Sequence, residues 1–387
     1  MAEDGYRPIG SLEMRIAVVG GGPAGLCFAT LWKKRHPDAT VQVFEQNPPD
    51  ATFGFGVVFS DQALEFLRED DPETHDLITP EMERWDDMTL VHRGETVTID
   101  GVGFSSIGRL HLLQMLQERA LAVGAELIFD TVVQSVDELA DFDLIVASDG
   151  VNSVVRRGFE GDFGMSLSYL ANKFAWYGVE TPFDTLTQTF VETAHGPFNA
   201  HHYRYTSTMS TFLVECARET WERAGFATMG EAESAQKCAE IFADMLGGKP
   251  LITNKSNWRN FPLMWNERWS HLNMVLLGDA LHTSHFSIGS GTRLALEDVI
   301  ALVEALEAQP DDMSAALQAY EAARKPIVQK IVTAATSSAR WYEDFADHMK
   351  LSPLEFGYAY MTRSGRIDND RLRKFAPGFM ARYEGQG

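Results

Sequence analysis

Three short stretches of the chain combine glycine with a carboxylate in patterns that can bind a nucleotide. The first, Gly20-x-Gly22-x-x-Gly25, follows the apolar run at residues 16–19, and Glu45 comes twenty residues after its last glycine. Glycines at this spacing permit a tight turn, the approach of a pyrophosphate to the backbone and close packing of a helix, whose N-terminus attracts the phosphates. Glu45 would accept hydrogen bonds from the ribose hydroxyls. The pattern therefore predicts a dinucleotide site, with a glycine-rich turn that binds no ligand as the alternative.

The other two stretches each pair an aspartate with a glycine directly after an apolar run. They are Asp149-Gly150 and Gly278-Asp279. A carboxylate in such a place can accept hydrogen bonds from the hydroxyls of a ligand such as ribitol, and glycine lets the backbone approach a planar ring. A turn or a helix-capping role is the alternative for either aspartate taken alone.

The hydrophobic pattern predicts the elements that position these motifs. Residues 14–47 read as strand, glycine turn, helix and strand, which is a βαβ unit. From about residue 166 to 265 the segments become extended and alternating, as expected of an inserted antiparallel sheet. The other predicted elements are helices at 109–123, 294–308 and 312–340, strands at 126–131 and 143–148, and extended segments at 187–192, 199–205 and 208–215. The predicted fold class is α/β.

The order of the three motifs resembles that of the single-component FAD-dependent aromatic hydroxylases of the para-hydroxybenzoate hydroxylase type, over nearly the whole chain from Arg15 onward. Phe286 stands where that family usually has a proline. Residues 172–177, 209–216 and 257–261 are similar to a narrower subgroup. It comprises salicylyl-CoA 5-hydroxylase, the hydroxylase half of anthraniloyl-CoA monooxygenase, and a hydroxylase of the violacein pathway.

The resemblance implies a Rossmann-like FAD-binding lobe of the glutathione-reductase type, an inserted mixed or antiparallel substrate sheet, and C-terminal helices. The expected FAD-binding domain comprises residues 14–85, 105–165 and 266–340, and the expected substrate-binding domain comprises 86–104 and 166–265. Residues 341–387 would be a C-terminal segment that closes over both, and residues 1–13 an extension or tag.

The resemblance also implies which residues bind FAD. The expected set is Gly20, Gly22, Ala24, Gly25, Glu45, Gly56, Val57, Arg109, Asp149, Gly150, Asp279, Gly289, Gly291 and Thr292. NADH or NADPH would be a transient reductant, since the single dinucleotide motif leaves no separate nicotinamide domain. O₂ would be the co-substrate, activated as a flavin C4a-hydroperoxide.

The implied activity is hydroxylation of an electron-rich aromatic ring. The leading substrate is an aromatic acyl-CoA thioester, as in the conversion of salicylyl-CoA to gentisyl-CoA. One alternative is the hydroxylation of an indole, a tryptophan-derived or another free aromatic metabolite. A further alternative is a flavin oxidase or reductase that hydroxylates no ring.

Candidate catalytic residues lie in the loop after the third motif. His285, Phe286 and Gly289 are expected beside the flavin, and His285 is favoured as the group that accepts a proton from the substrate. A hydrogen-bonded structural histidine is the alternative. Strand alternation places His201 and Tyr203 on one face of the inserted sheet. With Trp176 they are candidates for contact with substrate.

The C-terminal region offers a separate indication of the substrate. Between Met361 and Arg382 there are six basic residues and two acidic ones. Arg363 and Arg366 in this stretch could hold the phosphates of CoA through guanidinium contacts. The alternative is a solvated basic helix that pairs with the acidic stretch at residues 61–87 or with a partner subunit.

Composition excludes several other classes of protein. The 387 residues include 55 acidic and 33 basic side chains, a formal charge of −22 that disfavours nucleic acid and anionic membranes as partners. Three scattered cysteines and no ligand spacing predict neither a disulfide framework nor a metal site. No apolar run is long enough for a membrane span. We expect a cytoplasmic monomer or homodimer.

Overall fold

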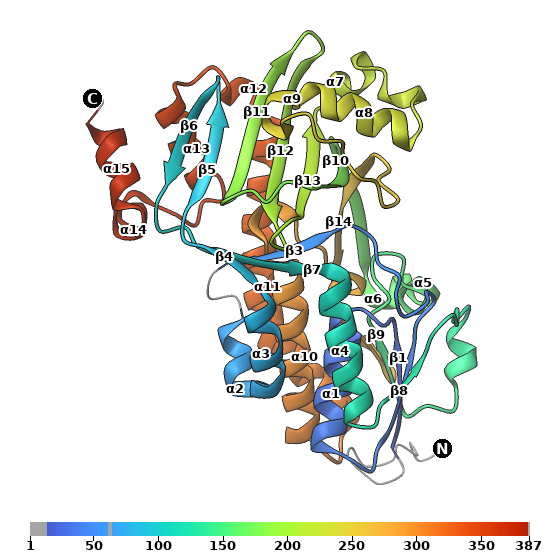
Figure 1. Cartoon of the computed structure of the whole chain (residues 1–387). Coiled ribbons are helices and arrows are strands. Elements are labelled where there is room, and N and C mark those ends of the chain that lie inside the picture. Colours follow the sequence, from blue (N-terminus) through green and yellow to red (C-terminus); the bar gives the residue numbers. More distant parts are fainter. Residues whose placement is uncertain (1–13, 61–63, 386–387) are drawn as a thin grey trace.

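The computed structural model describes residues 14–60 and 64–385, and within them the chain forms sheets of six, seven and three strands. The six-stranded sheet and its helices make one end of the molecule and the seven-stranded sheet makes the other (Figure 1). The extension or tag expected at residues 1–13 lies outside the described residues. Among the helices that are described, none has both the length and the apolar composition that a bilayer span requires.

The six-stranded sheet is parallel except at the edge formed by β15. Its order is β15 (Ser270–His271), β16 (Met274–Leu276), β9 (Leu144–Ala147), β1 (Arg15–Val19), β2 (Thr40–Phe44) and β8 (Glu126–Ile128). Apart from Arg15 at the start of β1, strands β1, β9 and β16 consist of buried apolar residues. Such continuous apolar strands are typical of parallel sheets. The βαβ unit predicted at the start of the chain is confirmed.

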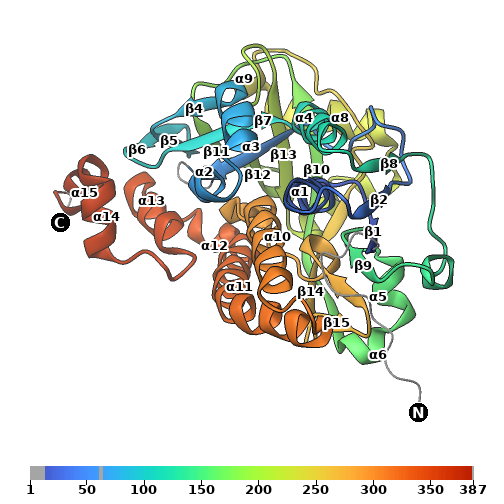
Figure 2. The ribbon, with the colours of Figure 1, turned by 90° about the horizontal axis from the view of Figure 1, so that it is seen from below.

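Long helices cover one face of this sheet, as Figures 1 and 2 show. They are α1 (Pro23–Arg35), α4 (Arg109–Ala122), α10 (Gly291–Ala308) and α11 (Met313–Glu343). Helix α1 packs against α4 and α10, and α10 packs along α11. Short elements follow the strands of the sheet: α5 (Val154–Gly158), α6 (Glu160–Phe163), and the 3-10 helices η2 (Val136–Leu139), η4 (Gly278–Ala280) and η5 (Phe286–Ile288).

The seven-stranded sheet is antiparallel except between β11 and β5. Its order is β14 (Arg259–Asn266), β10 (Met165–Val179), β13 (Ser210–Cys216), β12 (Gly196–Arg204), β11 (Leu186–Thr193), β5 (Met88–His92) and β6 (Glu95–Ile99). One face packs against α7 (Arg218–Arg223), η3 (Phe226–Thr228), α8 (Glu231–Ile241) and α9 (Ala243–Leu246). The opposite face packs against the end of α11 and the C-terminal helices.

A three-stranded sheet lies between the two larger ones. It consists of β3 (Gly56–Ser60), β7 (Phe104–Gly108) and β4 (Glu83–Trp85). The acidic stretch nearby forms the short helices α2 (Glu65–Asp70), α3 (Pro72–Ile78) and η1 (Thr79–Glu81). Because β7 leads directly into α4, this sheet connects the two lobes at the start of a helix of the first.

The C-terminal helices lie beside β5 and β6. They are α12 (Phe345–His348), α13 (Pro353–Thr362), α14 (Asn369–Phe375) and α15 (Pro377–Glu384). The carboxylate of Asp100, which follows β6, accepts hydrogen bonds from Gly378 N at 2.9 Å and Phe379 N at 2.6 Å at the start of α15. Arg382 donates to Thr98 O on β6. These contacts hold α15 against the edge strand of the sheet.

The predicted fold class is confirmed, and the exact domain boundaries stay a prediction. Several predicted elements differ at their ends by one to three residues, and two of the differences have a clear cause. The strand expected at 126–131 ends at Ile128, because the chain leaves the extended conformation at Asp130, whose φ is 53°. The helix expected at 312–340 continues to Glu343, where Asp344 N still bonds to carbonyls of the last turn.

Candidate active site

The three glycine and carboxylate motifs meet at one edge of the six-stranded sheet. Strands β16, β9 and β1 are neighbours and run parallel, and each ends immediately before one of the motifs. Strand β2, on the other side of β1, ends just before Glu45. In parallel α/β sheets, ligands bind outside the carboxyl ends of the strands. Motifs more than 100 residues apart in the chain therefore face one crevice.

Gly20 and Gly25 are required by the close packing of the loop itself. Gly20 has a φ of 100°, and a Cβ there would lie 2.5 Å from Ser148 O. A Cβ on Gly25 would lie 2.1 Å from Gly20 O and 2.5 Å from Ser148 Oγ. No side chain fits at such distances. These two glycines let α1 begin directly against β1 and β9.

Gly22 is different, because a Cβ there would meet nothing within 4 Å. It is the N-cap of α1, which has no side-chain cap and no acidic residue in its first turn. The first N–H groups of the helix and its positive dipole end therefore stay available to an anion. Beside this loop, Glu45 accepts hydrogen bonds from Gly21 N at 2.8 Å and from Asn47 N at 2.8 Å.

The second motif carries an unsatisfied carboxylate oxygen. Asp149 Oδ2 accepts a hydrogen bond from Val154 N at 2.7 Å, whereas its buried Oδ1 has no partner. Burial raises the pKa of this carboxyl. Gly150 has a φ of 75°, and a Cβ there would meet nothing within 4 Å. A polar group from a ligand can reach Asp149 here.

Arg156 joins the second motif to the third. It is buried, and its guanidinium donates to Val151 O and, at 2.8 Å, to Ala280 O. Gly278, with a φ of 55°, fits between helices because its missing Cβ would lie 3.2 Å from Ala295 Cβ and 3.6 Å from Ala24 Cβ. The Arg156 guanidinium thus joins the loops of the second and third motifs, and the close contacts of Gly278 hold the third motif against α1 and α10.

Asp279 and Arg109 face each other across the crevice. Asp279 is exposed, and its charge acts on the half-buried guanidinium of Arg109. The Arg109 side chain makes no hydrogen bond or ion pair with any residue of the described chain. Its backbone N–H donates to Phe55 O at 2.7 Å, which places it beside the loop before β3. An arginine held in this position can bind a ligand's phosphate or hydroxyl group.

The loop at residues 283–291 lies between the crevice and the seven-stranded sheet. Gly289 has a φ of 61°, and a Cβ there would lie 3.6 Å from Val58 O on β3. Ser284 Oγ and Ser290 Oγ are 2.8 Å apart and close the base of the loop. Gly291 and Thr292 begin α10, whose first turn has no side-chain cap. The loop can therefore approach a flat ligand with its backbone.

One face of the seven-stranded sheet presents aromatic side chains to this loop. Phe286 lies with its ring centroid 5.1 Å from that of Phe174, 6.4 Å from Trp176 and 5.8 Å from Phe261. The His201 ring is 5.4 Å from the same phenyl ring. We call Phe174, Trp176, Phe261 and Phe286 the aromatic cluster. Such a surface packs well against an aromatic ring.

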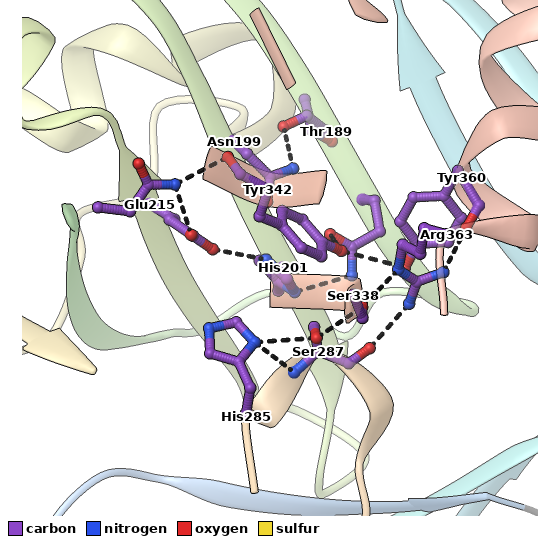
Figure 3. A network of polar contacts seen from close by, with 12 residues as sticks. Thr189, Asn199, His201, Glu215, His285, Ser287, Ser338, Tyr342, Tyr360 and Arg363 are labelled. Carbon is purple, nitrogen blue, oxygen red and sulfur yellow. Dashed lines mark hydrogen bonds and ion pairs between the residues drawn. The ribbon is translucent and has the colours of Figure 1, made fainter. Parts of the chain in front are cut away.

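A polar network runs through the same region (Figure 3). Arg363 Nε donates to Ser338 Oγ at 2.9 Å, Ser338 Oγ is 2.8 Å from Ser287 Oγ, and Ser287 Oγ is 2.9 Å from His285 Nδ1. Arg363 also donates to Ser287 O at 2.8 Å and lies 3.7 Å from the centroid of the Tyr360 ring. The network links α11 and α13 to the loop that carries His285.

Glu215 is the carboxylate closest to the imidazoles of this network. Its Oε1 accepts a hydrogen bond from Asn172 Nδ2 at 2.8 Å, and its Oε2 lies 3.5 Å from His201 Nε2. His201 Nδ1 is 2.9 Å from Gln188 Nε2. Burial raises the pKa of Glu215 and lowers that of His201 to about 3 and that of His285 to about 4.

Known proteins are similar to this chain over most of its length. Residues 140–335, about half of the chain, match the family model described as an FAD binding domain. A salicyloyl-CoA 5-hydroxylase from Streptomyces is 40% identical over 96% of this chain and 74% of its own. Protodeoxyviolaceinate monooxygenase from Chromobacterium violaceum is 35% identical over 90% of this chain and 94% of its own. A third relative is 3-hydroxy-4-methyl-anthranilyl-[aryl-carrier protein] 5-monooxygenase from Streptosporangium sibiricum, 37% identical over 86% of this chain and 90% of its own.

The chain belongs to the FAD-dependent aromatic monooxygenases. Solved structures show the same fold. A 2-methyl-3-hydroxypyridine-5-carboxylic acid oxygenase matches with a TM-score of 0.71 at 17% identity, over 96% of this chain and 98% of its own. PqsL from Pseudomonas aeruginosa matches with a TM-score of 0.67 at 19% identity, over 90% of this chain and all of its own. The family, the enzyme class and the FAD cofactor predicted from the sequence are confirmed.

The crevice fits FAD by its own chemistry. It offers an open backbone cradle at Gly22, an uncapped helix start for phosphates, and the orphaned Oδ1 of Asp149 as a hydrogen-bond acceptor. Arg109 adds an unpaired cation for an anionic group. The individual contacts of the cofactor stay predictions.

Some residues predicted to bind a ligand have other contacts in the monooxygenase. Tyr203 donates its hydroxyl to Gly56 O at 3.0 Å and is buried, so it supports β3 and does not face the aromatic cluster. A Cβ on Gly56 would meet Tyr205 Cβ at 2.7 Å, so this glycine accommodates the sheet behind it. Val57, next in β3, is half-buried and pairs with Ile107.

The two arginines predicted to bind CoA lie in different surroundings. Arg363 turns inward to the network of Figure 3, whereas Arg366 is exposed. Nearby, Arg373 pairs with Asp370 and Glu384. Within the described chain, the basic stretch therefore makes no ion pair with the acidic stretch predicted as its alternative partner.

Sequence reasoning missed three residues that hold the site together. Arg156 lies six residues after the Asp149-Gly150 pair, and its buried hydrogen bonds to backbone carbonyls give no pattern in the sequence. Asn254, which donates to Thr52 O at 3.1 Å and Gly54 O at 3.0 Å, also carries no sequence signal. Glu215 has a sequence signal, because it is the only charged residue within the buried strand β13. A charge at such a position is costly unless it is used or paired.

The buried histidines predict how stability depends on pH. His201 and His202 have pKa values lowered to about 3, and His285 to about 4, because burial disfavours the cation. Above about pH 6.5 these side chains are neutral in both the folded and the unfolded chain. As the pH falls below that value, only the unfolded chain gains their protons, so the free energy of unfolding should fall until about pH 4.

Each histidine contributes at most about 1.4 kcal/mol per pH unit to this slope. The raised pKa values of Glu215 and Asp149 act in the opposite direction and offset part of it. Urea unfolding at several pH values measures how the free energy of unfolding changes with pH. In His202→Gln the unfolded chain should take up about one proton fewer, so the slope should be smaller. A variant slope equal to that of the wild type would contradict the assignment.

Proposed function

We propose that the monooxygenase hydroxylates an aromatic acid carried as a CoA thioester, with salicylyl-CoA to gentisyl-CoA as the leading reaction. The observation that carries this proposal is the pair of relatives named for carrier-bound aromatic acids. One is named for salicyloyl-CoA at 40% identity, and the other for an anthranilyl group on an aryl-carrier protein at 37% identity. Both names describe an aromatic ring attached to a large carrier.

Bound FAD, reduced by NADH or NADPH, supplies activated O₂ for the transfer of one oxygen atom to the ring. We assign its pyrophosphate to the loop from Gly20 to Gly25, including Ala24, and its ribose to Glu45. The ribitol and the flavin ring are assigned to the remaining predicted cofactor residues, which are Gly56, Val57, Arg109, Asp149, Gly150, Asp279, Gly289, Gly291 and Thr292.

The aromatic cluster would hold the substrate ring against the flavin side of the loop. Phe286 and His285 lie between the seven-stranded sheet and the crevice, where a ring held on one side can face a cofactor on the other. Phe174 is buried and Trp176, Phe261 and Phe286 are partly buried in the free chain, so a bound ring would complete an apolar surface that excludes water and protects activated oxygen from being lost as hydrogen peroxide. The chain thus orients the ring and keeps the site dry.

Purified holoenzyme and a panel of aromatic CoA esters and free acids test this proposal. We expect salicylyl-CoA to stimulate NAD(P)H oxidation and to gain one oxygen atom, as measured by mass spectrometry. Stimulation only by free aromatic metabolites would favour the second candidate, which the protodeoxyviolaceinate monooxygenase relative supports at 35% identity. Hydrogen peroxide as the only product across the panel would favour an oxidase instead.

Arg366 provides a specific test of carrier recognition. It is exposed, whereas Arg363 is tied to Ser287 and Ser338. We expect Arg366→Ala to raise the KM for the CoA ester about 3- to 10-fold at low salt, because one exposed charge contributes about 1 kcal/mol. FAD content should not change. An unaltered KM at low salt would show that Arg366 does not bind CoA.

We further propose a cytoplasmic enzyme that acts as a monomer or homodimer. Cys27, Cys216 and Cys238 are all buried and unpaired, which suits a reducing compartment. Light scattering coupled to size-exclusion chromatography tests the assembly. A tetramer, the form named for one solved neighbour, would contradict it.

A further inference from the structure

A single carboxylate is buried in the sheet face that carries the aromatic cluster. Glu215 pairs in register with Phe174 on β10 and with Asn199 on β12, so the three side chains lie on one face of the sheet. Glu215 is only 2% exposed. Burying a carboxylate beside phenyl rings costs free energy that an apolar residue would not cost. A buried carboxylate at this position is therefore a candidate for a chemical role.

The two oxygens of Glu215 differ in how well they are satisfied. Oε1 accepts one hydrogen bond, from Asn172, whose amide also donates to Tyr342 O at 2.8 Å. Oε2 is buried and accepts no hydrogen bond, because His201 Nε2 at 3.5 Å is too distant for a good one. A carboxylate oxygen in this state has a free lone pair for a donor that enters the site.

The neighbouring imidazoles are poorer proton acceptors than Glu215. The chain of hydroxyl groups from Arg363 through Ser338 and Ser287 ends at His285 Nδ1, and Ser287 N also donates to that atom at 3.3 Å. Gln188 similarly occupies His201 Nδ1. Burial lowers the pKa of both imidazoles, so neither readily becomes a cation, whereas burial raises the pKa of Glu215.

The charged and titratable groups that face Glu215 come from several elements. They are His201 on β12, His285 in the loop, Tyr342 on α11 and Arg363 after α13. Two more groups lie close by: Glu343 on α11 accepts a hydrogen bond from Asn172 N, and Cys216, next to Glu215 in β13, lies on the opposite face of the strand. Arg363 is the one cation among these six groups, and it faces the imidazoles from the side of α13. A negative charge formed on a ligand between these groups would be stabilised by it.

We propose that Glu215 Oε2 accepts the proton of the hydroxyl group on the substrate's aromatic ring. The phenolic O–H bond breaks, its electron pair stays on the phenolic oxygen, and the proton forms a new O–H bond on the carboxylate. The ring becomes more electron-rich and reacts faster with electrophilic oxygen. This assignment rests on the proposed function, and it replaces His285 with Glu215 as the base.

The test compares wild-type holoenzyme with Glu215→Gln, which keeps the shape of the side chain and removes its ability to take a proton. His202→Gln is the matched control, because His202 lies on the neighbouring strand β12, is also buried, and bonds to Thr189 on the opposite face of the sheet. Each protein is measured for FAD content, for product formed per NAD(P)H oxidised between pH 6 and 9, and for the Kd values of salicylyl-CoA and benzoyl-CoA.

We expect Glu215→Gln to retain FAD and to lose at least 100-fold in the hydroxylation rate at pH 7, with hydrogen peroxide replacing product. The rate should recover with rising pH, and with a ring fluorinated next to the hydroxyl group, because a more acidic phenol ionises without a base. The preference for salicylyl-CoA over benzoyl-CoA should fall about tenfold, since a charge-assisted hydrogen bond is lost. His202→Gln should behave as wild type.

The outcomes separate the two proposals. If wild-type enzyme hydroxylates no CoA ester, the proposed function fails and this assignment fails with it. If wild type is active and Glu215→Gln keeps its pH profile, coupling and binding preference, only Glu215 is excluded as the base. If Glu215→Gln does not retain FAD, Glu215→Asp is compared with Glu215→Asn, because these two side chains have equal length and only the first can take a proton. Equal hydroxylation rates of the two variants would exclude the carboxylate as the base.

Discussion

Alanine at position 22 is expected to give a folded protein that no longer retains FAD. A Cβ on Gly22 meets nothing within 4 Å in the free chain, and its φ of −77° suits any residue. The methyl group would instead occupy the space assigned to the pyrophosphate. Overpacking of one methyl costs about 1–3 kcal/mol, which corresponds to roughly a 10- to 100-fold loss of affinity.

Flavin absorbance of the purified Gly22→Ala protein and fluorescence titration of the apoprotein with FAD measure this effect. Gly25→Ala is the contrasting variant, because its Cβ would collide with Gly20 O at 2.1 Å. We expect it to lower the melting temperature of the apoprotein itself, whereas Gly22→Ala should leave that temperature unchanged. If Gly22→Ala binds as much FAD as wild type, the assignment of the pyrophosphate to this loop is wrong.

Removing Asp298 is expected to destabilise the FAD-binding end of the fold strongly. Asp298 is fully buried in α10, where it lies 2.9 Å from His282 Nε2 and accepts a hydrogen bond from Arg324 Nε at 2.9 Å. Asp298→Ala would leave the Arg324 cation buried with only Glu297 as a partner. Breaking a buried pair costs about 3–5 kcal/mol.

Urea unfolding of the apoprotein measures that loss. The double variant Asp298→Leu with Arg324→Met removes both charges, and we expect it to be more stable than Asp298→Ala, because no cation stays uncompensated. His282 follows the Gly278-Asp279 turn, so the single variant should also bind FAD more weakly. A loss below about 1 kcal/mol would mean that water reaches Arg324.

The fold was predictable because local patterns determined it. The glycines of the first motif had to lie where a strand meets a helix, and the structure gives a steric reason for Gly20 and Gly25, whereas a Cβ on Gly22 would meet no atom of the chain within 4 Å. Alternation along β12 puts neighbouring residues on opposite faces, and His201 and His202 accordingly bond to Gln188 and Thr189 on opposite faces of the sheet. These features depend on neighbours close in sequence.

The sheet face that carries Glu215 was less predictable because it depends on register between distant strands. Glu215 meets His201 only through the pairing of β12 with β13, and it meets His285 only because the loop after β16 returns to the same face. Likewise, the inward turn of Arg363 follows from how α13 packs on α11, so counting basic residues could not separate it from Arg366. Composition indicates charge but not the direction of a side chain.

Closure of β6 by the last helix has a consequence for handling the protein. An unprotected edge strand can template pairing with another copy and start aggregation. Here Arg382 donates a hydrogen bond to Thr98 O, and the Asp100 carboxylate binds the start of α15 beside that edge. A C-terminal deletion or a bulky fusion at this end would unmask the strand, so affinity tags are better placed at the opposite terminus.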